Sequence, residues 1–204
     1  MRRLFIALEP DEATRALAAE IAATLRQGIG ARARLGFTSA ERIHVTLVFL
    51  GAVEEARLDE LNAIVEDVAR AHAPFAVEVG GVGAFPRSDR ARVLWLGFGS
   101  GSDPLRALVR DLETRLREAG HVFGNRAWTG HVTLARCHSP HGVDASAELA
   151  RCPDRRIDSP VAELVVMESV RESGRARYVA LELSLIHISE PTRLRRISYA
   201  VFCL

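Results

Sequence analysis

The sequence of 204 residues contains no lysine, so all 27 of its basic side chains other than histidine are arginines. This absence excludes a lysine nucleophile and the lysine-containing phosphate loop of many nucleotide-binding proteins. Arginine is a good bidentate phosphate ligand, but it does not act as a base at neutral pH. Any proton transfer must therefore be carried by other side chains.

Cysteine and long apolar segments are also scarce. The three cysteines, Cys137, Cys152 and Cys203, are not in CxxC spacing, so they indicate neither a disulfide framework nor a zinc site. No apolar run approaches the length of about 20 residues that a membrane-spanning helix needs. The apolar run at the N-terminus is too short for a signal peptide and is followed at once by Glu9, so we expect a first strand there and a cytoplasmic protein without a membrane partner.

The sequence also lacks a large excess of either charge, since the formal net charge is +1. There is no global electrostatic argument for nucleic acid or membrane binding, so any phosphate chemistry must come from a local cluster. The hydrophobic fraction of 48% is ordinary for a globular protein, and the length suits one domain or two small lobes that share a core.

Apolar periodicity predicts an α+β fold with two related lobes, because strands and helices follow one another in a similar way in each half. Strands are predicted at 3–9, 43–51, 75–85, 91–98, 131–137, 161–169 and 176–183, and helices at 10–27, 54–72 and 103–120. Residues 31–42 and 140–160 are expected to be irregular. We predict one two-lobed domain over residues 1–183, acting as a monomer with no obligate protein partner.

The last 21 residues, 184–204, do not fit this pattern. They contain Ile186, Ile188 and Ile197 in a chain otherwise sparing of isoleucine, and they follow a natural final strand that ends near Leu183. They resemble the translated read-through of a sequencing adapter, so we expect a non-native tail and leave it out of the functional argument. The alternative is a genuine C-terminal strand and helix.

One tetrapeptide, HVTL, occurs twice, at 44–47 and at 131–134. With seven histidines and eight threonines in the chain, about 0.3 His-x-Thr matches are expected by chance. Two matches inside an identical tetrapeptide, on apolar strands in different halves, therefore point to function. The purely structural alternative is that both histidines lie in the core and that the threonines are there because they favour strands.

Alternate residues of a strand point to one face, so each histidine should project together with its threonine. If the two strands meet, two imidazoles and two hydroxyls converge. One imidazole can then take a proton from a nucleophile while the other protonates a leaving oxygen, since an ordinary imidazole pKa of about 6.5 makes both forms accessible. The threonine hydroxyls can hold phosphate oxygens, and Arg136 can add positive charge.

These motifs resemble those of the two-histidine (2H) phosphoesterases, specifically the RNA 2′,3′-cyclic phosphodiesterase family, also called 2′-5′ RNA ligases. The resemblance is carried by RLFIAL, IHVTLVFLG, ARVLWLG, HVTLAR and ESVRESGRARYVAL, which span residues 3 to about 183. One departure is Gly130, where family members often have proline. The resemblance implies a pseudo-twofold fold, with antiparallel sheets lining a central cleft and helices outside.

It also implies the site and the reaction. His44 and His131 match the catalytic histidines, and Thr46, Thr133 and Arg136 match residues that bind the phosphate. Phe49 matches an aromatic position associated with stacking on the base. The implied reaction opens an RNA 2′,3′-cyclic phosphate end to a 2′-phosphate without a metal or another cofactor, and some family members join RNA ends through a 2′-5′ bond.

Strict alternation would point Phe49 away from His44, and Arg136 away from His131. Both can reach the cleft only if each strand ends or bulges just after its motif. Otherwise Phe49 is a core aromatic residue and Arg136 an exposed charge at a strand end.

Alternatives to this function remain open. One is a nucleotide- or RNA-binding module on the same fold without turnover, and another is an enzyme for a different cyclic phosphate or a 2′-5′ oligonucleotide. His131, His138 and His141 lack a matching carboxylate pattern, so no metal site is predicted. His72, His121 and His187 are expected at the surface or in linkers, and Trp95 and Trp128 in the core or the cleft wall.

Overall fold

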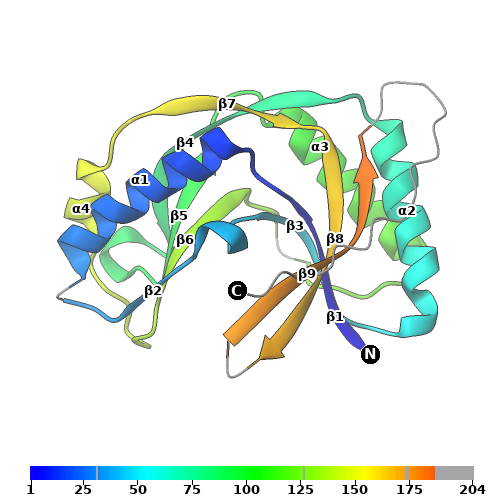
Figure 1. Ribbon diagram of the computed structural model, residues 1–204, viewed down its shortest axis with the longest axis horizontal. Helices are drawn as coiled ribbons and strands as arrows, with labels where there is room; N and C mark the ends of the chain where they lie inside the picture. The colour runs from blue at the N-terminus through cyan, green and yellow to red at the C-terminus, as the bar shows by residue number, and fades with distance from the viewer. Residues whose placement is uncertain (31, 126, 173–174, 187–204) are drawn as a thin grey trace, which may run out of the picture.

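The computed structural model describes residues 1–30, 32–125, 127–172 and 175–186, and it has the predicted α+β fold (Figure 1). Its strands are β1 (Arg2–Leu8), β2 (Leu35–Phe37), β3 (Val45–Val53), β4 (Phe75–Phe85), β5 (Val93–Phe98), β6 (His131–Cys137), β7 (Arg156–Val161), β8 (Glu163–Glu172) and β9 (Arg175–Leu185). Its α-helices are α1 (Glu12–Ile29), α2 (Leu58–Ala71), α3 (Asp103–Glu118) and α4 (Ser146–Arg151). Short 3-10 turns lie at Ala40–Arg42, Glu55–Arg57 and Ser88–Arg90.

The strands form one antiparallel sheet in the order β7-β4-β5-β6-β3-β1-β8-β9, with β2 on β6. The centre of this order is the contact between β3 and β6, where one pair of residues, Val45 and Val132, is in register. Each arm of the sheet combines strands from both halves of the chain. β4 lies beside β5 and β7 in one arm, and β8 lies between β1 and β9 in the other, so the two lobes are interleaved.

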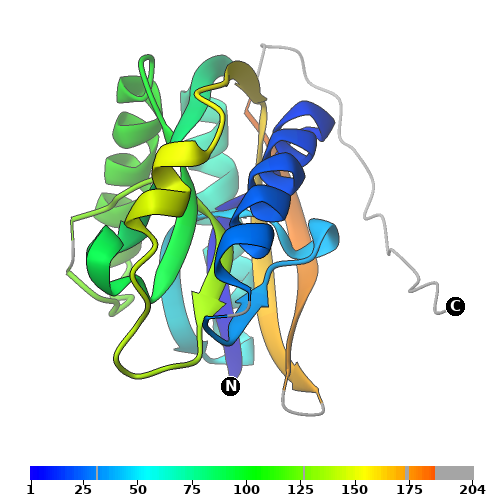
Figure 2. The same ribbon diagram turned by 90° about the vertical axis from the view of Figure 1, so that its left-hand side faces the viewer.

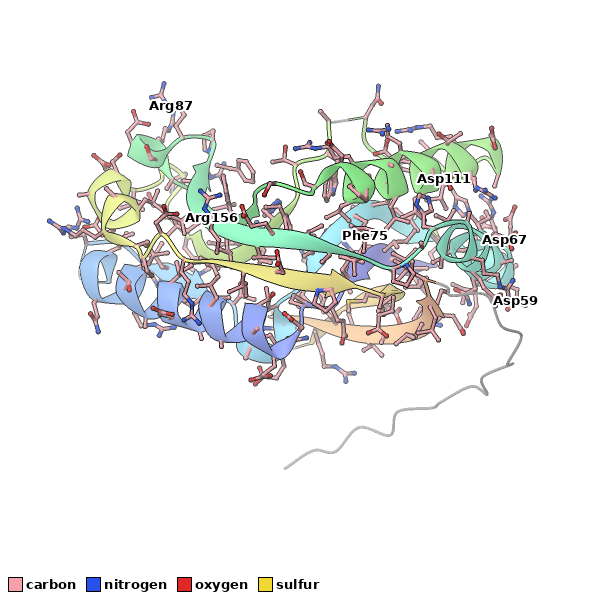
Figure 3. All side chains as sticks on the ribbon, turned by 90° about the horizontal axis from the view of Figure 1, so that it is seen from above. Asp59, Asp67, Phe75, Arg87, Asp111 and Arg156 are labelled. Atoms are coloured by element: carbon pink, nitrogen blue, oxygen red, sulfur yellow. The ribbon has the colours of Figure 1, made fainter. Side chains whose placement is uncertain are left out.

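The helices also cross between the halves. α1 packs on α4 and contacts β6 and β7, whereas α2 and α3 pack on each other and contact β8, β9 and β3. Figure 1 shows the first pair at one end of the molecule and the second pair at the other, and Figure 2 shows the first end turned towards the viewer. Seen from above in Figure 3, β4 and β7 run side by side between α1 and α3.

The helix positions follow from amphipathic stripes. The carboxylate of Asp11 caps α1 by accepting a hydrogen bond from the Thr14 backbone N–H at 3.0 Å. Leu17, Ile21 and Leu25, spaced four residues apart, are buried against the sheet. Pro104 occupies the first turn of α3, where its missing N–H costs no hydrogen bond. No helix in the described ranges is long and apolar enough to cross a bilayer.

Several segments differ from the sequence predictions. β2 lies in the segment 31–42, and α4 and most of β7 lie in the segment 140–160, both of which were expected to be irregular. These elements are short, and each depends on a partner distant in sequence, such as β6 for β2 and β4 for β7. β9 continues to Leu185, and Ile186 is buried, with its backbone N–H bonded to the Ala162 carbonyl. His187 and the rest of the predicted tail lie outside the described residues.

Candidate active site

The two HVTL segments lie directly beside each other, because Val45 of β3 pairs with Val132 of β6 in an antiparallel register. Both valines are buried, at 3% and 0% exposure, so they face the core. The flanking histidines and threonines of both motifs therefore point to the opposite face. Extending the register by one residue places His44 across from Thr133, and Thr46 across from His131.

Each histidine is held in the same way by its own strand. The Nδ1 atom of His44 lies 2.8 Å from the Arg42 carbonyl oxygen, and the Nδ1 atom of His131 lies 2.8 Å from the Thr129 carbonyl oxygen. A carbonyl only accepts, so Nδ1 must carry the hydrogen in the neutral ring. Nε2 of each ring is then left as the atom that can accept or donate a proton.

Aromatic rings set the orientation of both imidazoles. Tyr178 of β9 contacts His44 edge-on at 4.9 Å between centroids, and Phe5 of β1 lies 5.1 Å from it. Phe85 of β4 contacts His131 edge-on at 5.0 Å. Such contacts restrict ring rotation without using a polar atom of the imidazole. None of these aromatic residues was singled out from the sequence, because each lies on a strand far along the chain from the histidine it contacts.

A bulge follows each motif. Ile6 and Ala7 of β1 pair with Val48 and Thr46, which leaves Leu47 without a partner in the register. In the same way Leu134 is skipped between the pairs that Trp95 and Leu94 of β5 make with β6. The extra residue changes the alternation of each strand by one position.

The two bulges determine where Phe49 and Arg136 point. Leu47 and Val48 are both buried, as are Leu134 and Ala135, and the next residue in each strand is exposed. Phe49 is 45% exposed. It follows Thr46 by three residues in the sequence, as Arg136 follows Thr133. The bulges thus bring Phe49 and Arg136, whose orientation depended on such an irregularity, to the face that carries the histidines.

A pocket of about 300 Å³ opens on this face. Its wall includes Phe5, His44, Thr46, Phe49, Arg136 and Tyr178. Arg3 and Arg171 also line it, and the Arg3 guanidinium lies over the Phe49 ring at 5.0 Å from the centroid. The residues of the second motif, His131 and Thr133, are half-buried and lie outside this lining, so the pocket is on the His44 side of the paired strands.

Burial is the main cause that lowers the pKa of both histidines below the ordinary value. The positive charge of Arg136 lowers the pKa of both rings further, and His131 has the same effect on His44. The hydrogen bonds to the Arg42 and Thr129 carbonyls oppose this shift. Both imidazoles are therefore mainly neutral at pH 7 in the absence of a bound anion.

Trp128 connects the loop before β6 to the first motif. Its indole Nε1 donates a hydrogen bond to the Thr46 carbonyl oxygen at 2.9 Å. A Cβ atom at Gly130 would lie only 2.5 Å from Trp128 Cη2 and 2.8 Å from Phe98 Cδ2. The absence of a side chain at Gly130 therefore makes room for the Trp128 indole.

Replacing Gly130 with alanine should cost about 1–3 kcal/mol of unfolding free energy, because the new methyl group overpacks against Trp128 and Phe98. The cost should fall when Trp128 is also replaced with phenylalanine, which is smaller. Urea unfolding of the single and double variants measures this coupling. Gly124→Ala is the matched control, since its Cβ would meet nothing within 4 Å, and equal losses for Gly124→Ala and Gly130→Ala would contradict the packing argument.

The remaining histidines are dispersed. Among the described residues, no group of three or more His, Cys, Asp or Glu side chains is arranged to hold a metal ion. His121, expected at the surface or in a linker, lies in the segment between α3 and β6, where it is buried at 7% exposure. Its position just beyond the end of an amphipathic helix gave no local signal of burial.

Comparison with known proteins places the chain in a known family. Residues 10–172 match the model of the 2′-5′ RNA ligase superfamily. The chain is 33% identical over 147 residues to an RNA 2′,3′-cyclic phosphodiesterase of Methanothermobacter thermautotrophicus, covering 72% of this chain and 77% of the relative. It is 33% identical over 135 residues to a Thermotoga maritima protein of the same name, covering 66% and 69%.

Solved structures share the fold. The protein TT0787 of Thermus thermophilus superposes with a TM-score of 0.68 at 26% identity, over 90% of this chain and 97% of that one. Escherichia coli LigT complexed with 3′-AMP superposes with a TM-score of 0.65 at 24% identity, over the same shares of the two chains.

Proposed function

This chain belongs to the 2′-5′ RNA ligase superfamily, and on that premise we propose that it is an RNA 2′,3′-cyclic phosphodiesterase whose two HVTL motifs form one active site. The observation that carries the proposal is the pairing of Val45 with Val132, which puts both motifs on one face. Two imidazoles with free Nε2 atoms and two hydroxyls beside them are the groups that a metal-independent phosphoryl transfer needs.

In the proposed reaction, water attacks the phosphorus of the cyclic phosphate and the P–O3′ bond breaks. His131 Nε2 takes the proton from water, and His44 Nε2 gives a proton to the departing O3′. The product carries a 2′-phosphate and a free 3′-hydroxyl. The position of the pocket supports these roles, because a nucleoside bound on the His44 side brings its ribose oxygen to His44 and leaves the opposite approach, past His131, for water.

The other site residues bind and orient the substrate in this proposal. Thr46 and Thr133 donate their hydroxyl hydrogens to the non-bridging phosphate oxygens. Arg136 adds positive charge where the transition state gains negative charge. Phe49, exposed at the pocket wall, stacks on the base. A ribose 5′-hydroxyl in place of water would give 2′-5′ ligation by the same proton transfers, although abundant water favours hydrolysis.

The test is to incubate the protein with an RNA oligonucleotide that ends in a 2′,3′-cyclic phosphate, in the presence of EDTA, and to identify the product by chromatography against 2′- and 3′-phosphate standards. We expect the 2′-phosphate alone. Absence of turnover combined with saturable nucleotide binding would support a binding module instead. Turnover of only another cyclic phosphate or of a 2′-5′ oligonucleotide, in a substrate panel, would show that the substrate is wrong.

A further inference from the structure

A second pocket, of about 380 Å³, lies between α3 and the loop that leads into β6. Its lining includes Arg106, Arg110 and Glu113 of the helix and Asn125 and Trp128 of the loop. We call it the α3 groove. None of its lining residues belongs to the pocket at the paired motifs, so the two pockets are separate.

The two arginines of the α3 groove lie four residues apart, so they share one face of the helix. In the described parts of the chain, neither guanidinium has a carboxylate within ion-pair distance, although Asp103 precedes Arg106 by three residues and Glu113 follows Arg110 by three.

The other two arginines of α3 behave differently. Arg115 is paired with Asp111 at 3.0 Å, and Arg117 is paired with Glu113 at 3.3 Å. Glu113, the one acid of the groove lining, is thus already engaged by Arg117. The α3 groove therefore holds two uncompensated guanidinium groups, which suits an anion that both can contact.

The opposite wall of the groove offers an aromatic ring and an amide. The only polar atom of the Trp128 side chain is occupied by the Thr46 carbonyl, so the indole has only its ring to offer a ligand. Asn125 is exposed and carries both a donor and an acceptor. Two cations, an aromatic ring and an amide together match a phosphate joined to a base.

We propose that the α3 groove binds a phosphate-bearing nucleotide unit of the RNA strand, upstream of the cyclic end that the active site receives. This inference rests on the proposed function. The loop connects the two sites. The Trp128 indole donates a hydrogen bond to the Thr46 carbonyl, and the carbonyl of the next residue, Thr129, accepts one from His131 Nδ1. A strand lying in the groove is thus bound next to the segment that positions both motifs.

The test compares an oligonucleotide ending in a 2′,3′-cyclic phosphate with a 2′,3′-cyclic mononucleotide, using an Arg106→Gln/Arg110→Gln double variant. We expect KM for the oligonucleotide to rise about tenfold or more with little change in kcat, since two charge-assisted contacts are lost. The mononucleotide does not reach the groove, so its kcat/KM should stay at the wild-type value. The dependence of oligonucleotide KM on salt should also weaken in the variant.

The matched control is Arg115→Gln/Arg151→Gln, which removes the same charge from two arginines that lie outside the groove and are not paired with Glu113. Equal oligonucleotide KM values for the two double variants would overturn the proposal, as would an equal loss on both substrates in the groove variant. Binding of a 5′-labelled oligonucleotide with a plain 3′-hydroxyl, followed by fluorescence polarisation, needs no turnover. A lower affinity in the groove variant alone therefore supports the groove even if no substrate is hydrolysed.

The same binding assay separates the two sources of a nucleotide phosphate. Displacement of the labelled oligonucleotide from the groove by a longer unlabelled strand, and not by AMP at the same nucleotide concentration, supports binding of RNA. If AMP binds to the wild type and not to the groove variant, while both bind the oligonucleotide equally, the ligand is a free nucleotide and the proposed RNA subsite is wrong.

Discussion

Replacing His44 or His131 with alanine should lower kcat/KM for an RNA 2′,3′-cyclic phosphate by about 10²–10⁴-fold, because each variant loses one of the two proton transfers. The kcat/KM of the double variant should be only slightly lower than that of the less active single variant, because the two imidazoles act as a unit. Initial rates in EDTA, with the purified variants at a fixed pH, measure these losses.

Two further variants separate chemistry from folding. His141→Ala is the control, because this exposed loop histidine uses only its backbone in the hydrogen bonds of the structure. His44→Asn retains a short side-chain donor for the Arg42 carbonyl but lacks the Nε2 atom. It should therefore fold like the wild type and lose as much activity as His44→Ala. Wild-type activity in either alanine variant of the motif histidines would remove that residue from the mechanism.

The second large effect is expected at Arg136. Replacement with glutamine should lower kcat by about 10²-fold, the scale of losing one group that stabilises transition-state charge. The same change should move the pH profile of kcat/KM, which reports the free enzyme. In the wild type the active form carries one proton on the histidine pair, and burial and Arg136 lower the pKa of both rings. The profile should thus be bell-shaped, with its maximum below about pH 6.5.

The sign of the shift follows from the charge. Arg136 disfavours the protonated form of each imidazole, so its removal raises the pKa of both and moves the whole profile to higher pH. Phe49→Leu is the matched control, because Phe49 holds the equivalent place after the first motif and carries no charge. It should raise KM through lost stacking and leave the profile unmoved. An unmoved profile in Arg136→Gln would contradict the electrostatic role of the arginine.

The alternation of residues in the sequence was sufficient to predict the central strands and the side chains that share one face of them. His44 with Thr46 and His131 with Thr133 follow from alternation alone, and the amphipathic helices follow from their apolar stripes. The pairing of the two motifs with each other, and the combination of strands from both halves of the chain in each arm of the sheet, could not be read from the sequence, because the partners of these strands are distant in the chain. For the same reason β2 and β7 were missed.

The bulges were foreseen only as a condition for Phe49 and Arg136 to reach the site. A local signal for them exists, since two consecutive apolar residues after each threonine, Leu47 with Val48 and Leu134 with Ala135, interrupt the alternation, and all four are buried. The aromatic contacts on the imidazoles and the hydrogen bond from Trp128 to Thr46 arise only from tertiary packing. Such contacts have no signature in the spacing of residues.

The most direct test of the proposed mechanism uses a cyclic substrate in which sulfur replaces the bridging O3′ atom. A thiol has a pKa of about 8.5, so the sulfur can leave as a thiolate and needs no general acid. We expect this substrate to restore most of the activity of His44→Ala and none of that of His131→Ala, with a 2′-phosphate as product. Restoration of His131→Ala instead, or of neither variant, would contradict the assignment of His44 as the acid that protonates O3′.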